Sequence, residues 1–153
     1  MRVVVCTVVH HPADARIYYR QIQALLDAGK ELSERQWETY NLYKPSVATF
    51  KQNLKKYADM GLEIVSGTDM ISEFEKPAPV AAELALMVDY GMSNLAAIAA
   101  GTSNCARVLG LENKTGILAK DAAADILVVE GNPAENIADL ERVKAVYFGG
   151  ERV

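Results

Sequence analysis

The apolar and polar positions at the start of the chain predict one strand followed by one helix. Residues Val3 to Val9 form a mostly β-branched run without alternation, which is typical of a strand covered on both faces in a parallel sheet. Pro12 suits the first turn of a helix, and Asp14 complements the positive end of its dipole. Apolar residues recur at helical spacing from Ile17 to Leu26, and Gly29 can end the helix. A strand–loop–helix unit is therefore expected.

A long helical stretch is predicted next, where an α/β unit would normally return promptly to a strand. Pro45 must either start a new helix or kink a continuous one between Glu31 and Met60. The apolar positions at three- and four-residue steps favour a core stripe over a ligand site. That stripe consists of Trp37, Tyr40, Tyr43, Val47, Phe50, Leu54 and Tyr57.

The remaining pattern predicts a short strand, three helices and two further strands. The strand covers residues 62–66 and is closed by Gly67, Thr68 and Asp69. Three helices are predicted, over 80–90, from Ser93 to residue 100, and from Thr102 or Ser103 to residue 109. Serine or threonine can begin the second and third of them, and glycine can end each one. Apolar runs over 124–130 and 143–148 predict strands separated by a turn at 131–133.

Composition narrows the classes of function. A chain of 153 residues that is half apolar can bury one domain's core, and its net charge of −4 argues against nucleic-acid binding. Lys51, Lys55 and Lys56 are expected to form a solvated helix face. Cys6 and Cys105 are far apart and are expected to be buried free thiols in a reducing compartment. The first apolar run is too short to span a membrane and lacks a signal-peptide cleavage pattern, so a cytoplasmic location without membrane partners is expected.

Several short motifs occur in a fixed order from residue 34 to residue 153. Together they resemble the end of the metal-dependent amidohydrolase superfamily, in particular imidazolonepropionase-like and prolidase-like members. Each motif alone is weak, and their order carries the resemblance. They are 67–69 at a strand end, 83–92, Ala97 with Ile98, 102–111, 116–118, 124–129 and 132–133.

This resemblance implies a fold and a site. Such enzymes are (β/α)8 barrels with a small β-sandwich built from both chain ends. Asp69 would follow the eighth barrel strand as the catalytic, metal-associated carboxylate that helps to activate the hydrolytic water, and catalysis on that fold belongs at the carboxyl ends of strands. The fold class expected is α/β: partial (β/α)8-barrel or Rossmann-like βα units, then helices and two or three sandwich strands. Residues 31–123 would be the barrel end and 124–153 the sandwich strands.

Two features depart from the family pattern. Asp121 and Ala122 stand where Gly-Lys is usual before the strand at 124, so that turn is expected to differ. The loop from Met70 to Pro79 contains no histidine, although some relatives use one there.

Residues 1–30 resemble a different family. They are similar to the first βα unit of a GT-B glycosyltransferase of the family-4 type, in which the loop after the first strand faces the sugar-acceptor cleft. His10, His11, Asp14 and Arg16 would be the acceptor-loop residues. A surface loop with a helix-capping interaction explains the same four residues equally well, because the strand after Gly29 and the nucleotide-sugar domain are missing.

The histidine content argues against a working hydrolytic site in one copy of the chain. A hydrolytic zinc ion usually has three protein ligands and a water, and the parent family draws them from a His-x-His pair, a Lys or Glu bridge and two later histidines. This chain has two histidines, at adjacent positions 10 and 11, which point to opposite faces of a strand. No bound cofactor is therefore expected. Asp69 is either an inherited catalytic carboxylate, now idle, or a turn residue.

Three functional hypotheses remain open. The chain is an amidohydrolase segment that is inactive alone, a natural or engineered fusion without native activity, or a glycosyltransferase-like acceptor-binding module. The first and eighth strands could pair in parallel, with the helices over 13–60 as the crossover. A two-stranded sheet is marginally stable, so self-association into a homo-oligomer through exposed strand edges is also expected.

Overall fold

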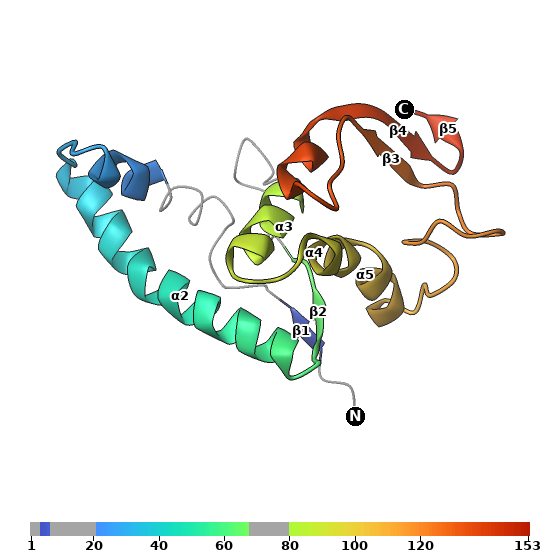
Figure 1. The fold of residues 1–153 in the computed structure, drawn as a ribbon, viewed down its shortest axis with the longest axis horizontal. Helices are drawn as coiled ribbons and strands as arrows, with labels where there is room; N and C mark the ends of the chain where they lie inside the picture. The colour runs from blue at the N-terminus through green and yellow to red at the C-terminus, as the bar shows by residue number, and fades with distance from the viewer. Residues whose placement is uncertain (1–3, 7–20, 68–79) are drawn as a thin grey trace.

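The elements of the chain alternate between short strands and helices, in a computed structural model that describes residues 4–6, 21–67 and 80–153 (Figure 1). Residues 21–27 are helical. The other elements are β1 (Val4–Cys6), α2 (Glu34–Asp59), β2 (Glu63–Val65), α3 (Val80–Asp89), α4 (Asn94–Gly101), α5 (Ser103–Val108), β3 (Ile126–Val129), the 3-10 helix η1 (Ile137–Glu141), β4 (Val143–Phe148) and β5 (Glu151–Arg152).

The first sheet joins two strands that are far apart in the sequence. β1 pairs with β2 in parallel, with Val5 opposite Ile64. The chain between them passes through the helical residues 21–27 and α2, as a parallel connection requires a long crossover. The expected parallel pairing is therefore confirmed. The rest of the predicted first strand lies outside the described residues.

The helical residues 21–27 end where the glycine was predicted to end them. Gly29 has φ +67°, and its N–H donates to Leu26 O at 2.9 Å. The N–H of Lys30 donates to Leu25 O at 2.9 Å, so the last carbonyls of the helix are satisfied. This segment packs against the first half of α2, where the Tyr40 hydroxyl donates to Gln23 Oε1 at 2.8 Å.

α2 is one continuous helix of 26 residues that runs through Pro45. Ser33 begins it with a capping box: its hydroxyl accepts from the Gln36 N–H, and the Gln36 side chain accepts from the Ser33 N–H. Of the two alternatives predicted at Pro45, a new helix or one continuous helix, the structure thus shows the continuous helix. The core stripe is only partly confirmed, because Tyr40 and Leu54 are buried whereas Trp37 is 43% exposed. No helix within the described ranges is both long and apolar enough to cross a bilayer.

The hydrophobic core lies between β2 and the helices that follow it. It takes Leu54 from α2 and Ile64 from β2, and most of its remaining side chains come from α3 and α4. Ile137 of η1 closes it from the C-terminal part of the chain. The three predicted helices are confirmed. The buried cluster consists of Leu54, Ile64, Leu84, Leu86, Met87, Tyr90, Met92, Ala97, Ala100 and Ile137.

Helices α4 and α5 follow one another without a loop. The Ser93 hydroxyl accepts from the Ala96 N–H and caps α4, as predicted. Thr102 does not cap α5 with its side chain; its hydroxyl instead donates back to Ile98 O at 2.7 Å. Thr102, one of the two predicted residues, is therefore at the N-cap position of α5, but its hydroxyl is bonded to the last turn of α4 and supplies no capping hydrogen bond.

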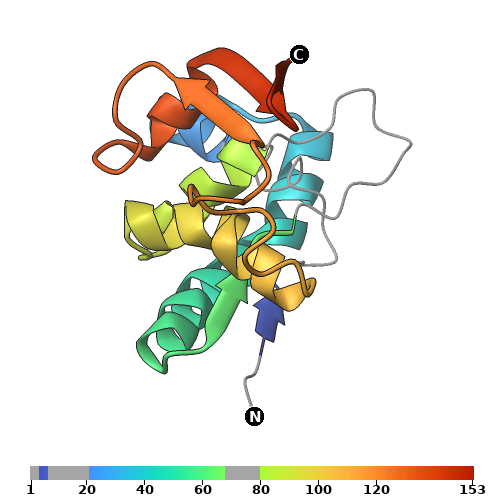
Figure 2. The same cartoon turned by 90° about the vertical axis from the view of Figure 1, so that its right-hand side faces the viewer.

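The C-terminal residues form a separate antiparallel sheet in the order β3–β4–β5. It lies on the far side of the helices from β1 and β2 in both views (Figures 1 and 2). The two predicted strands are confirmed, and β5 was not predicted. Ahead of this sheet, Asp121 has φ +67°, a left-handed conformation that favours glycine, so the aspartate occupies a backbone position that suits the glycine it replaces.

Candidate functional site

The predicted catalytic residue, Asp69, follows the carboxyl end of β2 in the sequence. β2 ends at Val65, and Ser66 and Gly67 are the last residues described before Asp69. Asp69 itself lies outside the described residues, as do His10, His11, Asp14 and Arg16. The structure therefore shows the frame from which Asp69 extends, and both the metal-ligand and acceptor-loop assignments stay predictions.

Helices α4 and α5 hold this strand end through their junction. The Ser66 N–H donates to Ala100 O, near the end of α4, at 2.9 Å. From the first turn of α5, the Asn104 amide donates to Ile64 O at 3.0 Å. This bond joins a backbone carbonyl of β2 to a side chain of α5. The direction in which the chain leaves β2 is fixed by these contacts.

The thiol of Cys105 lies in the same junction. It donates to Ala100 O at 3.0 Å and lies 3.8 Å from Ser66 Oγ. Cys105 is a free thiol, as expected, but it is half-buried and not fully buried. Its contacts are with backbone and hydroxyl groups, so it contributes to packing at the end of β2. The side chain of Cys6 lies outside the described part of the chain.

An ion pair fixes α5 to the start of β2. Arg107 Nη1 pairs with Glu63 Oε1, and Arg107 Nε lies 3.4 Å from Glu112 Oε1. The side chain of Glu63 is 12% exposed and that of Arg107 is 34% exposed. The hydrogen bond and the charge of Glu63 raise the pKa of Arg107 above its ordinary value, so the guanidinium stays protonated. β2 is thus attached to α5 at Glu63 and Ile64, and the residue after it, Ser66, is attached to α4.

These positioning residues were not found by sequence reasoning. Asn104 and Arg107 belong to the quoted motif over 102–111, but nothing in their spacing indicates the strand that they contact. Asn104 is 40 residues from Ile64, and Arg107 is 44 residues from Glu63. A polar pair at such a separation leaves no periodic signal.

The donor atoms within the described ranges do not fit a metal centre. No three His, Cys, Asp or Glu side chains come together in residues 4–6, 21–67 and 80–153. Both histidines of the chain lie at positions 10 and 11 and are not among them. We therefore derive no catalytic step through a metal from this structure.

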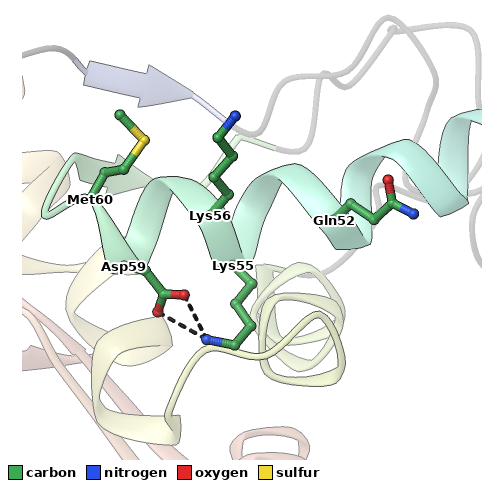
Figure 3. Close-up of a pocket in the computed structure, with 5 residues that line it drawn as sticks. All are labelled: Gln52, Lys55, Lys56, Asp59 and Met60. Atoms are coloured by element: carbon green, nitrogen blue, oxygen red, sulfur yellow. Dashed lines mark hydrogen bonds and ion pairs between the residues drawn. The ribbon is translucent and has the colours of Figure 1, made fainter.

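A shallow surface depression on α2 has no catalytic geometry. It is lined by Gln52, Lys55, Lys56 and Asp59 of α2 and by Met60, the residue that ends this helix (Figure 3). Lys55 Nζ lies 2.7 Å from Asp59 Oδ2, and their side chains are about 60% exposed. The expectation of a solvated basic helix face is confirmed for Lys55 and Lys56.

Replacing Asn104 with alanine should lower the free energy of unfolding by about 1–3 kcal/mol, because Ile64 O loses its part-buried donor. Urea unfolding followed by circular dichroism measures this change. Asn94→Ala is the matched control, since its amide donates to Ala134 O at an exposed position and should change stability by roughly 0.5 kcal/mol or less. Equal losses in the two variants would show that Asn104 does not hold β2.

Solved structures of several hydrolases are similar to this chain. A Xaa-Pro dipeptidase with methionine bound in its active site is 25% identical with a TM-score of 0.67, covering 91% of this chain and 33% of that protein. A Bifidobacterium longum protein assigned as a prolidase is 30% identical with a TM-score of 0.66, covering 84% and 31%. A prolidase complexed with N-methylphosphonate-L-proline is 21% identical with a TM-score of 0.64, covering 100% and 40%, and shows the fold alone.

The chain spans about a third of the length of these structures. Its mixed helices and strands therefore resemble part of an amidohydrolase barrel. No curated protein matches the chain at a significant level. None of the comparisons supports a glycosyltransferase origin for residues 1–30, and that resemblance stays a prediction. The family match includes residues 7–30 and continues to the last residue, over 7–153, against the family described as Amidohydrolase family. The chain belongs to the amidohydrolase family.

Proposed function

We propose that this chain is the closing part of a metal-dependent amidohydrolase that cleaves the amide bond of Xaa-Pro dipeptides. The observation that carries the proposal is the set of hydrogen bonds that hold the carboxyl end of β2 to α4 and α5. Ser66, three residues before Asp69, is bonded to α4, and Ile64, five residues before Asp69, is bonded to α5. On a barrel, the carboxyl end of a parallel strand is where catalytic side chains belong. The dipeptidase and prolidase neighbours support the substrate class.

In this proposal, Asp69 is the carboxylate that accepts a proton from the attacking water. The metal, when bound in the complete enzyme, would lower the pKa of that water and polarise the amide carbonyl. A general base must lie within hydrogen-bond reach of its proton, so its position matters as much as its basicity. Asn104, Ser66 and the Glu63–Arg107 pair act as positioning residues, because they fix the strand from which Asp69 extends.

One copy of the chain is proposed to be inactive. Asp69 is the residue that sequence reasoning offers as a metal ligand, and the two histidines of the chain, His10 and His11, are adjacent and do not form a His-x-His pair. A hydrolytic site needs several ligands that converge on one ion. The missing ligands would have to come from further polypeptide. The fusion and acceptor-binding alternatives rest on sequence resemblance alone, and no contact in the described residues favours them.

Residues 124–153 are proposed to be strands of a small β-sandwich, with residues 31–123 as the barrel end. The sheet β3–β4–β5 is separate from β1–β2, which supports this division. Phe148 of β4 is 72% exposed, which fits a sheet face that packs against the other layer of a sandwich.

A chimera tests the role of Asp69. Residues 34–153 of this chain would replace the matching segment of the Bifidobacterium longum prolidase, to which the chain is 30% identical. The chimera should hydrolyse Xaa-Pro dipeptides, and Asp69→Asn should lower its kcat roughly a hundredfold or more, since a general base typically contributes that much.

Asp59→Asn is the control for the chimera, because Asp59 is an exposed residue of α2 paired with Lys55. It should leave kcat unchanged. A folded, active chimera in which Asp69→Asn has no effect would favour the alternative that Asp69 is a turn residue. If the chimera folds but is inactive, the amount of metal bound by the chimera is compared with the amount bound by its Asp69→Asn variant.

A further inference from the structure

One carboxyl group is buried among the helices that surround β2. Glu83 lies in the first turn of α3 and is 0% exposed. Among the residues that the structure describes, it is the one charged side chain that is buried. Taking a carboxylate out of water is costly unless hydrogen bonds or opposite charges replace the water. The carboxyl group of Glu83 is therefore expected to bind polar groups of the chain around it.

The buried positions of α3 show which way Glu83 faces. Met87 and Tyr90 follow it at steps of four and three residues and are also buried, so the three side chains lie on one side of the helix. Met87 and Tyr90 belong to the buried cluster that includes Ile64 of β2. Glu83 thus continues the side of α3 that faces the interior shared with β2.

Two close contacts place the ends of α3 relative to β2. Just after α3 ends, a Cβ on Gly91 would lie 3.6 Å from Lys55 Cβ, in the last turns of α2, which leads into β2. Near its beginning, Leu84 Cδ1 would lie 3.1 Å from a Cβ on Gly101, the last residue of α4. The end of α4 also bonds Ser66, just beyond β2. The first turn of α3 therefore lies at the level of the carboxyl end of β2.

We propose that Glu83 is a further positioning residue of the proposed site. Its carboxylate accepts hydrogen bonds from the polypeptide that leaves β2 after Val65 and leads to Asp69. A carboxylate accepts several hydrogen bonds at once, so one buried group can orient a turn of backbone. Asn104 of α5 and Glu83 of α3 then hold the same strand end from two helices. The inference rests on the proposed function for the role of Asp69.

The alternative role of Glu83 is confined to α3. A carboxylate in the first turn of a helix interacts favourably with the positive end of the helix dipole. Such a role does not require burial, because Glu34 occupies the first turn of α2 with an exposed side chain. The complete burial of Glu83 therefore favours a role toward the interior, and Glu34 provides a control at a matched helix position.

Hydrogen exchange of the intact chain, followed by mass spectrometry, tests the inference without any need for activity. Glu83→Gln keeps the shape and one acceptor oxygen, whereas Glu83→Met keeps the size of the side chain without a comparable acceptor. In Glu83→Met, peptides that contain Ser66 should exchange roughly tenfold faster or more, because buried donors lose their partner. Glu83→Gln should fall between Glu83→Met and the wild type.

Peptides from α3 and β4 provide the internal comparison, and their exchange should change much less than that of the Ser66 peptides. Glu34→Gln and Glu34→Met are the matched control variants. They remove a first-turn carboxylate at an exposed position and should leave exchange at Ser66 at the wild-type rate. If Glu83→Met does not fold, the exchange of Glu83→Gln decides.

The same substitutions in the chimera connect Glu83 to catalysis. Glu83→Met should lower kcat roughly tenfold with KM nearly unchanged, because a displaced general base loses rate and not substrate binding. Glu83→Gln should restore part of kcat. If Asp69→Asn leaves an active chimera unaffected, the proposed function fails, whereas the exchange result at Ser66 does not depend on Asp69.

Three outcomes would overturn the inference. In the first, folded Glu83→Met exchanges at the wild-type rate in peptides that contain Ser66. In the second, faster exchange is confined to α3, which shows that Glu83 stabilises only its own helix. In the third, α3, β4 and the Ser66 peptides all accelerate equally, which shows a loss of global stability and no specific hold on the end of β2.

Discussion

Replacing Leu86 with alanine is expected to lower the free energy of unfolding by about 2–5 kcal/mol, the range for a buried leucine that leaves a cavity. Leu86 is 1% exposed on α3, within the cluster that joins α2, β2, α4 and η1. Its neighbours come from separate elements and cannot all move inward to fill the space. Urea unfolding followed by circular dichroism and by tyrosine fluorescence measures the change.

Leu95→Ala is the matched control for Leu86→Ala. Leu95 is 66% exposed on the neighbouring helix α4, so the same deletion should cost roughly 0.5 kcal/mol or less. Similar losses for the two variants would mean that the core between β2 and α3 is not the one described. A lower slope of stability against urea in Leu86→Ala would instead show a more compact unfolded state or a loss of two-state behaviour.

Gly116→Ala is expected to destabilise the chain by roughly 2–5 kcal/mol, through a strained backbone and overpacking together. Gly116 has φ +77°, and a Cβ there would lie 2.8 Å from Thr102 O and 3.0 Å from Ala106 Cβ. Thr102 O already accepts from the Ala106 N–H, so the helix cannot yield cheaply. The loop that leads from α5 to the C-terminal sheet would be displaced.

Gly110 provides the control that separates the two causes. It has φ +71°, nearly the same as Gly116, and a Cβ there would meet nothing within 4 Å. Gly110→Ala should therefore show only the backbone cost of about 1 kcal/mol. If both variants lose the same stability in thermal unfolding, the close approach of Gly116 to α5 does not matter in solution.

Periodicity predicted the helices because each one shows a repeat bounded by a cap. The apolar spacing between Val80 and Leu109 and the glycines at 91 and 110 were sufficient for α3 to α5. It could not predict β5, which consists of Glu151 and Arg152 and depends on the turn that returns the chain to β4. Two polar residues carry no period.

Periodicity also could not show which part of a helix surface is covered. The stripe on α2 was predicted as core along its length, yet Trp37 is 43% exposed while Tyr40, one turn later, is buried. Tyr40 is covered because the helical residues 21–27 pack there, and Gln23 Oε1 accepts a hydrogen bond from the Tyr40 hydroxyl. Burial therefore depends on a tertiary contact that the spacing of α2 does not contain.

Of the candidate site, the sequence predicted only Asp69 and the strand before it. The position of Asp69 after a strand follows from the motif over 67–69, and β2 is where the sequence placed it. The residues that hold β2 come from α5, and their partners lie about 40 residues earlier. Side-chain bonds of this kind are set by how elements pack and not by local pattern, so the structure was needed to find them.

Hydrolysis of a Xaa-Pro dipeptide by the purified 153-residue chain, with zinc or manganese added, tests the central claim most directly. The claim is that this chain provides the Asp69 end of an amidohydrolase site whose metal ligands it does not complete alone. Release of proline should equal that of an Asp69→Asn sample at the same metal concentration, and dialysed protein should retain less than stoichiometric metal. Turnover that Asp69→Asn abolishes, together with stoichiometric bound metal, would contradict the claim.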